Sequence, residues 1–246
     1  MGQRKSSKNA CIGVLLCLLA AIPLGSLAAG TQGRKGGPSQ ASPTMPRPGD
    51  AALGQGKADA ERCIECHGAD GQGQGHSNGP EGKFARLAGQ QAAYIVKQIQ
   101  DFRSGARKHD QMAIMARSIT DEDAADIAAY FASLPSMRGD ARDVSELGRR
   151  LYEQGDSVRG VPACAACHGP RGEGQRAQPL SPVLGGQEWR YLDQQLRNWR
   201  SGDRRNSPGG VMSDAIRPLT DTEIEALASH LSGLSAHSDQ QGNTTP

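Results

Sequence analysis

The chain has 246 residues, of which 36% are hydrophobic and 4% aromatic, and its formal net charge is +2. This length accommodates one large domain or two small ones, but the modest apolar content predicts a thin core. A net charge so close to zero excludes the basic surplus that nucleic-acid-binding proteins carry.

The N-terminus has the layout of a secretory signal peptide. Three basic residues between positions 4 and 8 precede an apolar stretch over residues 11–24. Small residues follow, so we expect cleavage after Ala28, which would remove residues 1–28 and export a soluble mature protein. The apolar stretch is shorter than the roughly 20 residues of a typical membrane span. Cleavage leaves 25 basic against 26 acidic residues, so the mature chain is almost neutral.

A Gly-, Pro- and Ser-rich segment follows over residues 29–50, which predicts a disordered leader. From residue 51 the composition changes, and we expect a short helix over residues 51–62. A similar helix is expected over residues 145–154. Each of these helices leads directly toward a pair of cysteines.

All four cysteines of the mature chain belong to Cys-x-x-Cys-His motifs, made of Cys63, Cys66 and His67 and of Cys164, Cys167 and His168. In this pattern the two thiols form thioether bonds with the vinyl groups of haem, and the histidine becomes the proximal ligand of the iron. Cysteine pairs in an exported protein ordinarily suggest disulfides. Neither a disulfide nor a zinc half-site explains the histidine that follows both pairs. The sequence therefore predicts two covalently bound haem c groups.

The chain also repeats itself with a period of about one hundred residues. Besides the cysteine motifs, Leu87-Ala-Gly-Gln90 matches Leu184-Gly-Gly-Gln187 in the same order along the chain. We therefore predict two homologous domains over residues 51–135 and 143–236. A linker over residues 136–142 joins them, and residues 237–246 form a disordered tail.

Both repeats have helical periodicity. The apolar residues that define it are Ile95, Ile99, Phe102, Ile127, Phe131 and Leu134 in the first copy and Leu192, Leu196, Trp199, Leu227, Leu231 and Leu234 in the second. We expect the last helix of each copy to begin with a capping box, Thr120-x-x-Asp123 and Thr220-x-x-Glu223. No convincing alternating pattern of a strand occurs, so the predicted fold class is all-α.

The second axial ligand decides whether a haem iron transfers electrons or binds a small molecule. Met112 and Met212 occupy matching positions in the two repeats, eight residues before Thr120 and Thr220. We predict them as the axial ligands opposite His67 and His168. Met115 is the alternative in the first repeat. Methionine on an apolar face is otherwise a filler of gaps in the core.

The remaining candidates are weaker. Four histidines have no counterpart in the other repeat and are predicted surface residues: His76, His109, His230 and His237. Four residues that recur in both repeats are interpreted as ordinary packing residues, with a place lining the haem or the domain interface as the alternative: Gln90, Tyr94, Gln187 and Tyr191. Pro80 and Pro179 are placed to offer a backbone carbonyl to the proximal imidazole N–H, with Pro182 as the alternative.

Taken together, these motifs resemble the dihaem cytochrome c4 family over residues 54–234. The resemblance implies two tandem class I cytochrome c domains related by a pseudo-two-fold axis, with haems close enough to exchange electrons. It also implies a periplasmic carrier, soluble or loosely associated with the membrane surface. Its redox partners would be a quinol–cytochrome c reductase-like donor and a terminal-oxidase-like acceptor.

Two other functions are alternatives to this one. A dihaem enzyme of the peroxidase or thiosulfate-oxidising type needs an open or labile iron position, whereas both repeats carry a methionine at the matching place. A cytochrome subunit of a larger oxidoreductase would have the same haem-binding residues. We predict an electron-transfer protein without catalytic residues.

Overall fold

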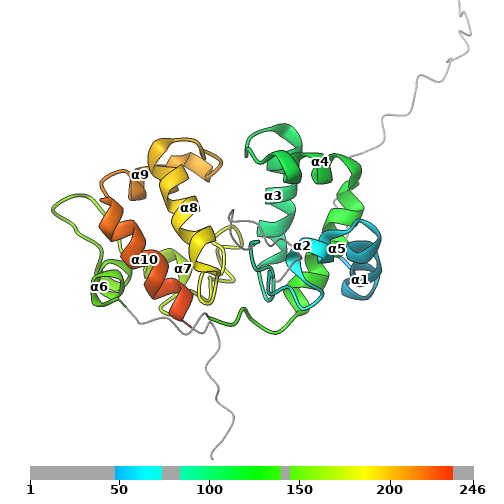
Figure 1. The fold of residues 1–246 in the computed structure, drawn as a ribbon, viewed down its shortest axis with the longest axis horizontal. Helices are drawn as coiled ribbons and strands as arrows, with labels where there is room; N and C mark the ends of the chain where they lie inside the picture. Colours follow the sequence, from blue (N-terminus) through cyan, green and yellow to red (C-terminus); the bar gives the residue numbers. More distant parts are fainter. Residues whose placement is uncertain (1–47, 74–83, 140–144, 235–246) are drawn as a thin grey trace, which may run out of the picture. The chain divides into compact units, whose positions relative to one another are not determined.

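The structure is a computed structural model that describes residues 48–73, 84–139 and 145–234 (Figure 1). The first repeat forms α1 (Ala51–Ala60), α2 (Cys63–His67), α3 (Ala92–Ser104), α4 (Asp110–Ser118) and α5 (Asp121–Ser133). The second forms α6 (Glu146–Gln154), α7 (Ala165–His168), α8 (Trp189–Ser201), the 3-10 helix η1 (Pro208–Gly210), α9 (Val211–Ile216) and α10 (Asp221–Gly233).

Helices are the only regular secondary structure in the described ranges, where β-structure is limited to two isolated bridges. The prediction of an all-α fold is confirmed. None of the helices described is long and apolar enough to cross a membrane. The predicted signal peptide, most of the leader and the tail lie outside the described residues.

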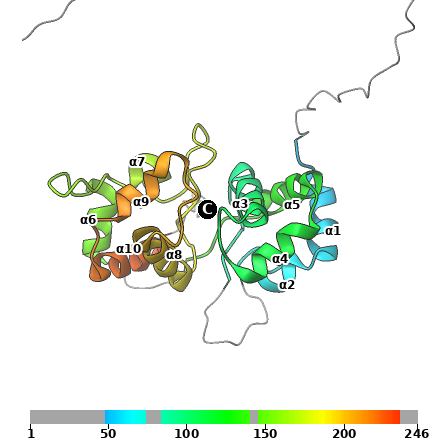
Figure 2. The same cartoon turned by 90° about the horizontal axis from the view of Figure 1, so that it is seen from above.

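Each domain is built on a crossing between its first and last helices, where α1 packs on α5 and α6 packs on α10 (Figure 1 and Figure 2). A glycine lies at each crossing. A Cβ added to Gly54 would lie 1.9 Å from the carbonyl oxygen of Asp126, and one added to Gly148 would lie 2.1 Å from that of Ala226. The helices therefore approach backbone to backbone, which a larger residue would prevent.

Gly54→Ala should destabilise the first domain by about 1–3 kcal/mol, because the added methyl group overpacks this crossing. Gly56→Ala is the matched control on the same helix, since a Cβ there meets nothing within 4 Å. The control should be neutral or stabilising by up to about 1 kcal/mol, the difference in helix propensity between the two residues. Thermal unfolding measures both variants, and equal midpoints would contradict the close crossing.

Each domain has its own hydrophobic core, and the predicted apolar stripes line it. The buried members of these stripes are Ile95, Ile99, Phe102, Ile127 and Phe131 in the first domain and Leu192, Leu196, Trp199, Leu227 and Leu231 in the second. Leu134 and Leu234 are partly buried against the same cores. The helical periodicity of the sequence thus identified the inward faces correctly.

The capping-box prediction is right for α10 and wrong for α5. Thr220 accepts a hydrogen bond from the Glu223 N–H, and the Glu223 carboxylate accepts one from the Thr220 N–H at 2.9 Å. Thr120 likewise accepts from the Asp123 N–H at 3.0 Å. The Asp123 side chain is one methylene shorter, and its carboxylate accepts from the Thr120 hydroxyl at 2.7 Å and pairs with Lys57 of α1 at 2.6 Å rather than accepting from the Thr120 N–H. The start of α5 is therefore capped by the threonine alone.

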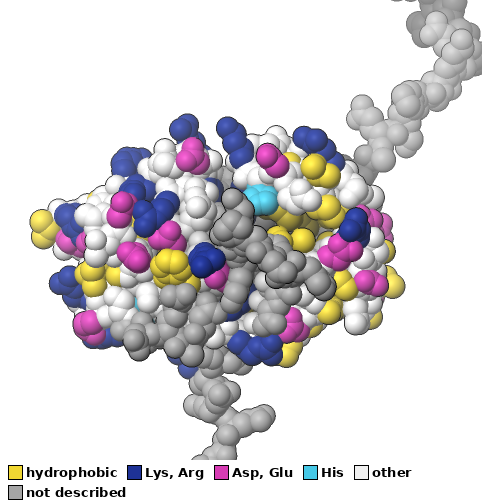
Figure 3. Space-filling view, in the orientation of Figure 1, with side chains coloured by type: hydrophobic (Ala, Val, Ile, Leu, Met, Phe, Trp, Pro, Cys, Tyr) yellow, Lys and Arg dark blue, Asp and Glu magenta, His cyan; other side chains and the backbone are white. Residues whose placement is uncertain are grey.

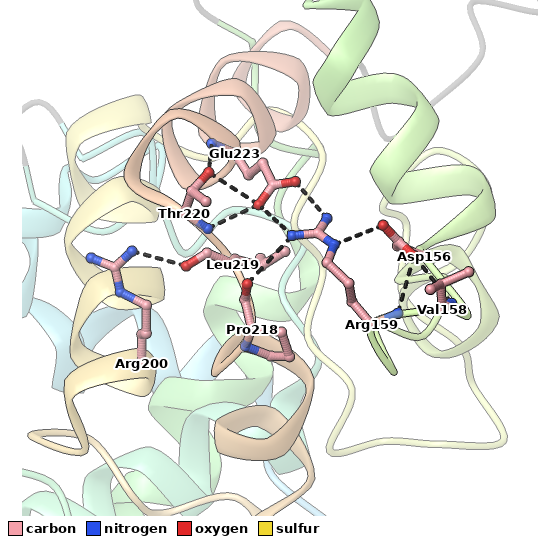
Figure 4. A network of polar contacts seen from close by, with 8 residues as sticks. All are labelled: Asp156, Val158, Arg159, Arg200, Pro218, Leu219, Thr220 and Glu223. Carbon is pink, nitrogen blue, oxygen red and sulfur yellow. Dashed lines mark hydrogen bonds and ion pairs between the residues drawn. The ribbon is translucent and has the colours of Figure 1, made fainter.

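A loop over residues 155–163 precedes the second cysteine motif, where the first repeat has only two residues between α1 and Cys63. Arg159 anchors this loop: it donates to Asp156 at 2.7 Å and to Glu223 at 2.6 Å, and it contacts the Pro218 carbonyl (Figure 4). The hydrogen bond from Arg159 lowers the pKa of Glu223 to about 2. Glu223 therefore stays ionised at neutral pH and joins the loop to the start of α10.

His230 is buried on α10, contrary to the prediction of a surface residue. Its side chain is 3% exposed, and its ring centroid lies 5.6 Å from that of Tyr152. Its Nδ1 has no hydrogen-bond partner among the residues that the structure describes. Burial lowers the pKa of His230, because desolvation disfavours the charged imidazolium. The folded protein therefore holds this side chain neutral.

The second domain should lose stability as the pH falls below about 6.5, the ordinary pKa of histidine. In that range the unfolded chain binds a proton at His230 that the folded chain does not, so acid favours unfolding. The charged groups that face His230 are Glu153, Arg149 and Glu146. Denaturant unfolding of wild type and His230→Leu between about pH 5 and pH 8 measures the effect. An unchanged slope in the variant would assign the acid sensitivity to other groups.

Two buried arginines make reciprocal hydrogen bonds where the domains meet. Arg107 of the first domain donates to the Tyr191 hydroxyl at 2.9 Å and to Gln195 at 2.7 Å. Arg204 of the second domain donates to the Tyr94 hydroxyl at 3.0 Å. The interpretation of Tyr94 and Tyr191 as ordinary packing residues is therefore wrong and the alternative, a place at the domain interface, is correct, because both hydroxyls are hydrogen-bonded across it.

Candidate functional site

The cysteines of each Cys-x-x-Cys-His motif are three residues apart on a helical turn, a spacing that places both thiols on one side of the turn. All four are free thiols: Cys63, Cys66, Cys164 and Cys167. Burial raises the pKa of both Cys63 and Cys164 to about 11, so these two are protonated at neutral pH. A thiolate ligand of a metal ion would instead need a lowered pKa. Within the described ranges no group of three or more His, Cys, Asp or Glu side chains is placed to hold a metal ion.

The two motif histidines are held in the same way. The Nδ1 of His67 lies 2.8 Å from the Ala85 carbonyl oxygen, and the Nδ1 of His168 lies 3.0 Å from that of Pro182. Burial lowers the pKa of both imidazoles, which keeps them neutral. A neutral imidazole that donates through Nδ1 leaves the Nε2 lone pair available to a metal, the arrangement typical of ligating histidines.

The carbonyl acceptors correct one prediction from sequence. Pro182, the alternative, accepts from His168, so the choice of Pro179 is wrong. In the first domain Ala85 at the corresponding position accepts from His67, and Pro80 lies outside the described residues. A backbone carbonyl leaves no trace in the side-chain sequence, which is why spacing from the histidine was a poor guide.

The glycines after each motif bring the carbonyl acceptors back to the histidines. Gly71 has a φ of 67°, and its carbonyl oxygen accepts from the Leu87 N–H at 2.8 Å. Gly172 has a φ of 71°, and its carbonyl oxygen accepts from the Leu184 N–H at 2.7 Å. A Cβ added to Gly71 would lie 2.8 Å from the Ala88 nitrogen. These glycines are therefore structural, and they explain why the glycine and Leu-x-Gly-Gln motifs recur together.

Met112 of α4 and Met212 of α9 lie half-buried against the two cores. Met112 packs on the same cluster as Cys63, and Met212 packs on the same cluster as Cys164. Met115 is also half-buried, but it is not part of the cluster that includes Met112 and Cys63. The packing therefore favours Met112 over Met115 as the partner of the first motif.

The backbone at each methionine is capped by a residue for which the sequence predicted no such role. His109 accepts a hydrogen bond from the Met112 N–H at 3.3 Å, and the Ser207 hydroxyl accepts one from the Met212 N–H at 3.2 Å. His109 is exposed, as predicted. It forms the N-cap of α4 and so helps to position the helix that bears Met112.

These residues fit a covalently bound haem in each domain. Each set comprises two free thiols, a neutral imidazole anchored through Nδ1 and a thioether on the apolar core. Figure 3 shows hydrophobic side chains gathered beside a histidine on the first domain. Thiol, imidazole and thioether are the protein groups that haem attachment and axial ligation use.

Comparison with known proteins gives concordant matches. The family model for cytochrome c matches residues 51–135 and 145–235. Cytochrome c4 of Thiocapsa roseopersicina is 40% identical over 191 residues, which cover 77% of this chain and 95% of that protein. A thiosulfate dehydrogenase electron acceptor of Stutzerimonas stutzeri is 38% identical over 179 residues, 71% of this chain and 80% of that protein. The crystal structure of reduced recombinant cytochrome c4 from Pseudomonas stutzeri covers 76% of this chain and 100% of its own, with 37% identity and a TM-score of 0.68.

Proposed function

The chain belongs to the cytochrome c family and, within it, to the dihaem cytochromes c4, and we propose on that basis that it carries electrons in the periplasm from a quinol-oxidising complex to a terminal oxidase. It is an electron-transfer protein rather than an enzyme, with two tandem cytochrome c domains and two covalently bound haem c groups. Its partners are therefore redox proteins, and encounters of that kind bury little surface and are transient.

The haem-binding residues follow from the two matching sets. We assign Cys63 and Cys66 as the anchors of the first haem, with His67 and Met112 as its axial ligands. The second haem has Cys164 and Cys167 as its anchors, with His168 and Met212 as its axial ligands. The haem supplies a one-electron redox centre when bound. His67 and His168 would each hold it through a neutral imidazole, and Met112 and Met212 would each offer it a thioether from beside an apolar core.

One observation supports the carrier function most strongly: both domains present the same complete donor set, each with a half-buried methionine on the core that also holds the motif cysteine. Two protein ligands per iron leave no position for a substrate. Redox titration of the purified protein should therefore show two electrons per chain. The reduced native protein should also fail to bind carbon monoxide, and binding at either haem would instead favour the enzyme.

The physiological direction of transfer can be tested with membranes. Membranes that oxidise quinol should reduce the protein, and membranes with a terminal oxidase should oxidise it again. Export can be tested on the same preparation, because cleavage after Ala28 would give a mature N-terminus at Ala29. A chain that is isolated only within a larger oxidoreductase would favour a permanent subunit instead.

A thiosulfate dehydrogenase is a second candidate donor, because one relative at 38% identity is named as the electron acceptor of such an enzyme. The two donors can be distinguished directly. Purified thiosulfate dehydrogenase should reduce the protein only when thiosulfate is present. Reduction by quinol-oxidising membranes without thiosulfate would support the first donor.

A further inference from the structure

Gln90 and Gln187 bridge the two domains in a reciprocal way. Gln187 of the second domain accepts a hydrogen bond from the Arg86 N–H at 2.8 Å and donates to the Arg86 carbonyl at 2.9 Å. Gln90 of the first domain accepts from the Val183 N–H at 2.8 Å and donates to the Val183 carbonyl at 2.9 Å. All four residues are buried. Each glutamine thus pairs with both backbone groups of one residue in the other domain.

These backbone groups belong to the segments that hold the haem-ligating histidines. The Ala85 carbonyl, which accepts from His67, and the Arg86 N–H are parts of one peptide unit. The same is true of the Pro182 carbonyl, which accepts from His168, and the Val183 N–H. Because a peptide unit is planar and rigid, a glutamine that fixes its N–H also fixes the direction of its C=O.

A hydrogen bond on one end of a peptide unit also polarises the other end. The Gln187 carbonyl, the 85–86 peptide and the His67 imidazole form a continuous chain of hydrogen bonds in a buried site, where such chains reinforce one another. Only a primary amide offers a neutral donor and a neutral acceptor side by side, as both partners require here. This requirement explains why glutamine recurs at the end of both Leu-x-Gly-Gln motifs.

We propose that Gln90 and Gln187 are positioning residues that act crosswise: Gln187 of the second domain sets the proximal ligand of the first haem, and Gln90 of the first domain sets that of the second. The inference rests on the proposed function, in which His67 and His168 are haem ligands. A more firmly hydrogen-bonded imidazole is a more basic ligand and stabilises the oxidised metal. Each domain therefore lowers the reduction potential of the haem in the other.

Gln187→Met and Gln90→Met test the proposal, because methionine keeps much of the side-chain length but pairs with neither backbone group. In Gln187→Met the oxidised-to-reduced equilibrium of the first haem should shift roughly tenfold toward the reduced form, the lower end of what loss of such a partner costs. This shift corresponds to about 59 mV upward for one electron. The second haem should keep its potential, and Gln90→Met should give the mirror image.

Gln195→Met is the matched control. Gln195 also lies at the interface, but it accepts from the side chains of Arg107 and Arg204 and not from either histidine-holding peptide. The control should not shift the reduction potential of either haem selectively. Each potential is assigned to its domain by NMR contacts between the protons of a haem and those of the core residues of that domain. Shifts in the glutamine's own domain, equal shifts in both haems or no shift would overturn the proposal.

Two further measurements make the result decisive. Haem content is measured first: fewer than two haems in the wild-type chain contradicts the proposed function itself, whereas two haems with parallel shifts contradict only the crosswise role. The second measurement is hydrogen exchange on the wild-type protein, which does not depend on whether a variant folds. The Nδ1 proton of His67 and the amide proton of Arg86 should exchange with the same free energy of opening. A lower free energy of opening at Nδ1 would overturn the proposal.

Discussion

Met212→Ala should open a coordination position at the haem of the second domain. The thioether is the only methionine sulfur that packs on the core beside Cys164 among the described residues, and alanine offers no replacement ligand. Methionine ligation raises the potential of a haem iron. We therefore expect the potential of this haem to fall by an amount on the order of 0.1–0.3 V, within the roughly 0.8 V that axial ligands span. The reduced variant should also bind carbon monoxide, as its absorbance spectrum would record.

The first domain offers a matched pair of controls for the same assignment. Met112→Ala should bind carbon monoxide at the first haem, whereas Met115→Ala should not, because Met112 shares its core cluster with Cys63 and Met115 does not. Binding by the Met115 variant alone would transfer the ligand role to Met115. A Met212→Ala protein with an unchanged spectrum and potential would show that the sulfur is not a ligand of the second haem.

Replacing Cys164 and Cys167 together by alanine should reduce the haem content from two groups per chain to one. The two thiols are the covalent anchors in our assignment, and without them the second domain would hold its haem only through axial ligands. The second domain should then lose much of its stability, since the haem would complete its core. Pyridine haemochrome analysis against protein concentration measures the ratio.

Replacing Cys63 and Cys66 by alanine should instead leave one haem, in the second domain. This variant is the control for effects of unfolding on haem attachment. Mass spectrometry of each denatured variant shows whether the surviving haem is covalently bound. Two covalent haems in either double variant would exclude these thiols as the anchors.

Features encoded by local side-chain patterns could be predicted from the sequence. The cysteine motifs, the repeat and the buried stripe that includes Phe102 depend on residues close together in the chain or on helical periodicity. The incomplete capping box of α5 could not be predicted, because the pairing of Asp123 with Lys57 depends on how α1 packs. A sequence pattern treats aspartate and glutamate as equivalent, whereas one methylene decides the outcome here.

The part of the site beyond the motifs depends on backbone acceptors and on contacts between domains. Ala85 holds His67 through a carbonyl that any residue could supply, so its identity carries no signal. Gln90 and Gln187 did carry a signal in the sequence, because a packing role does not require the same polar side chain in both repeats. Recurrence of a buried amide in two copies indicates a partner that needs both a donor and an acceptor.

The reciprocal contacts of Gln90 and Gln187 have the character of an isologous interface, in which one self-complementary patch is used twice. In a symmetric pair of identical subunits, any substitution in such a patch alters both halves at once. In a duplicated chain the halves can diverge separately, as they have where Arg86 faces Gln187 and Val183 faces Gln90. Tandem duplication thus turns a symmetric contact into two independently adjustable ones, so that two chemically identical cofactors can be given different properties.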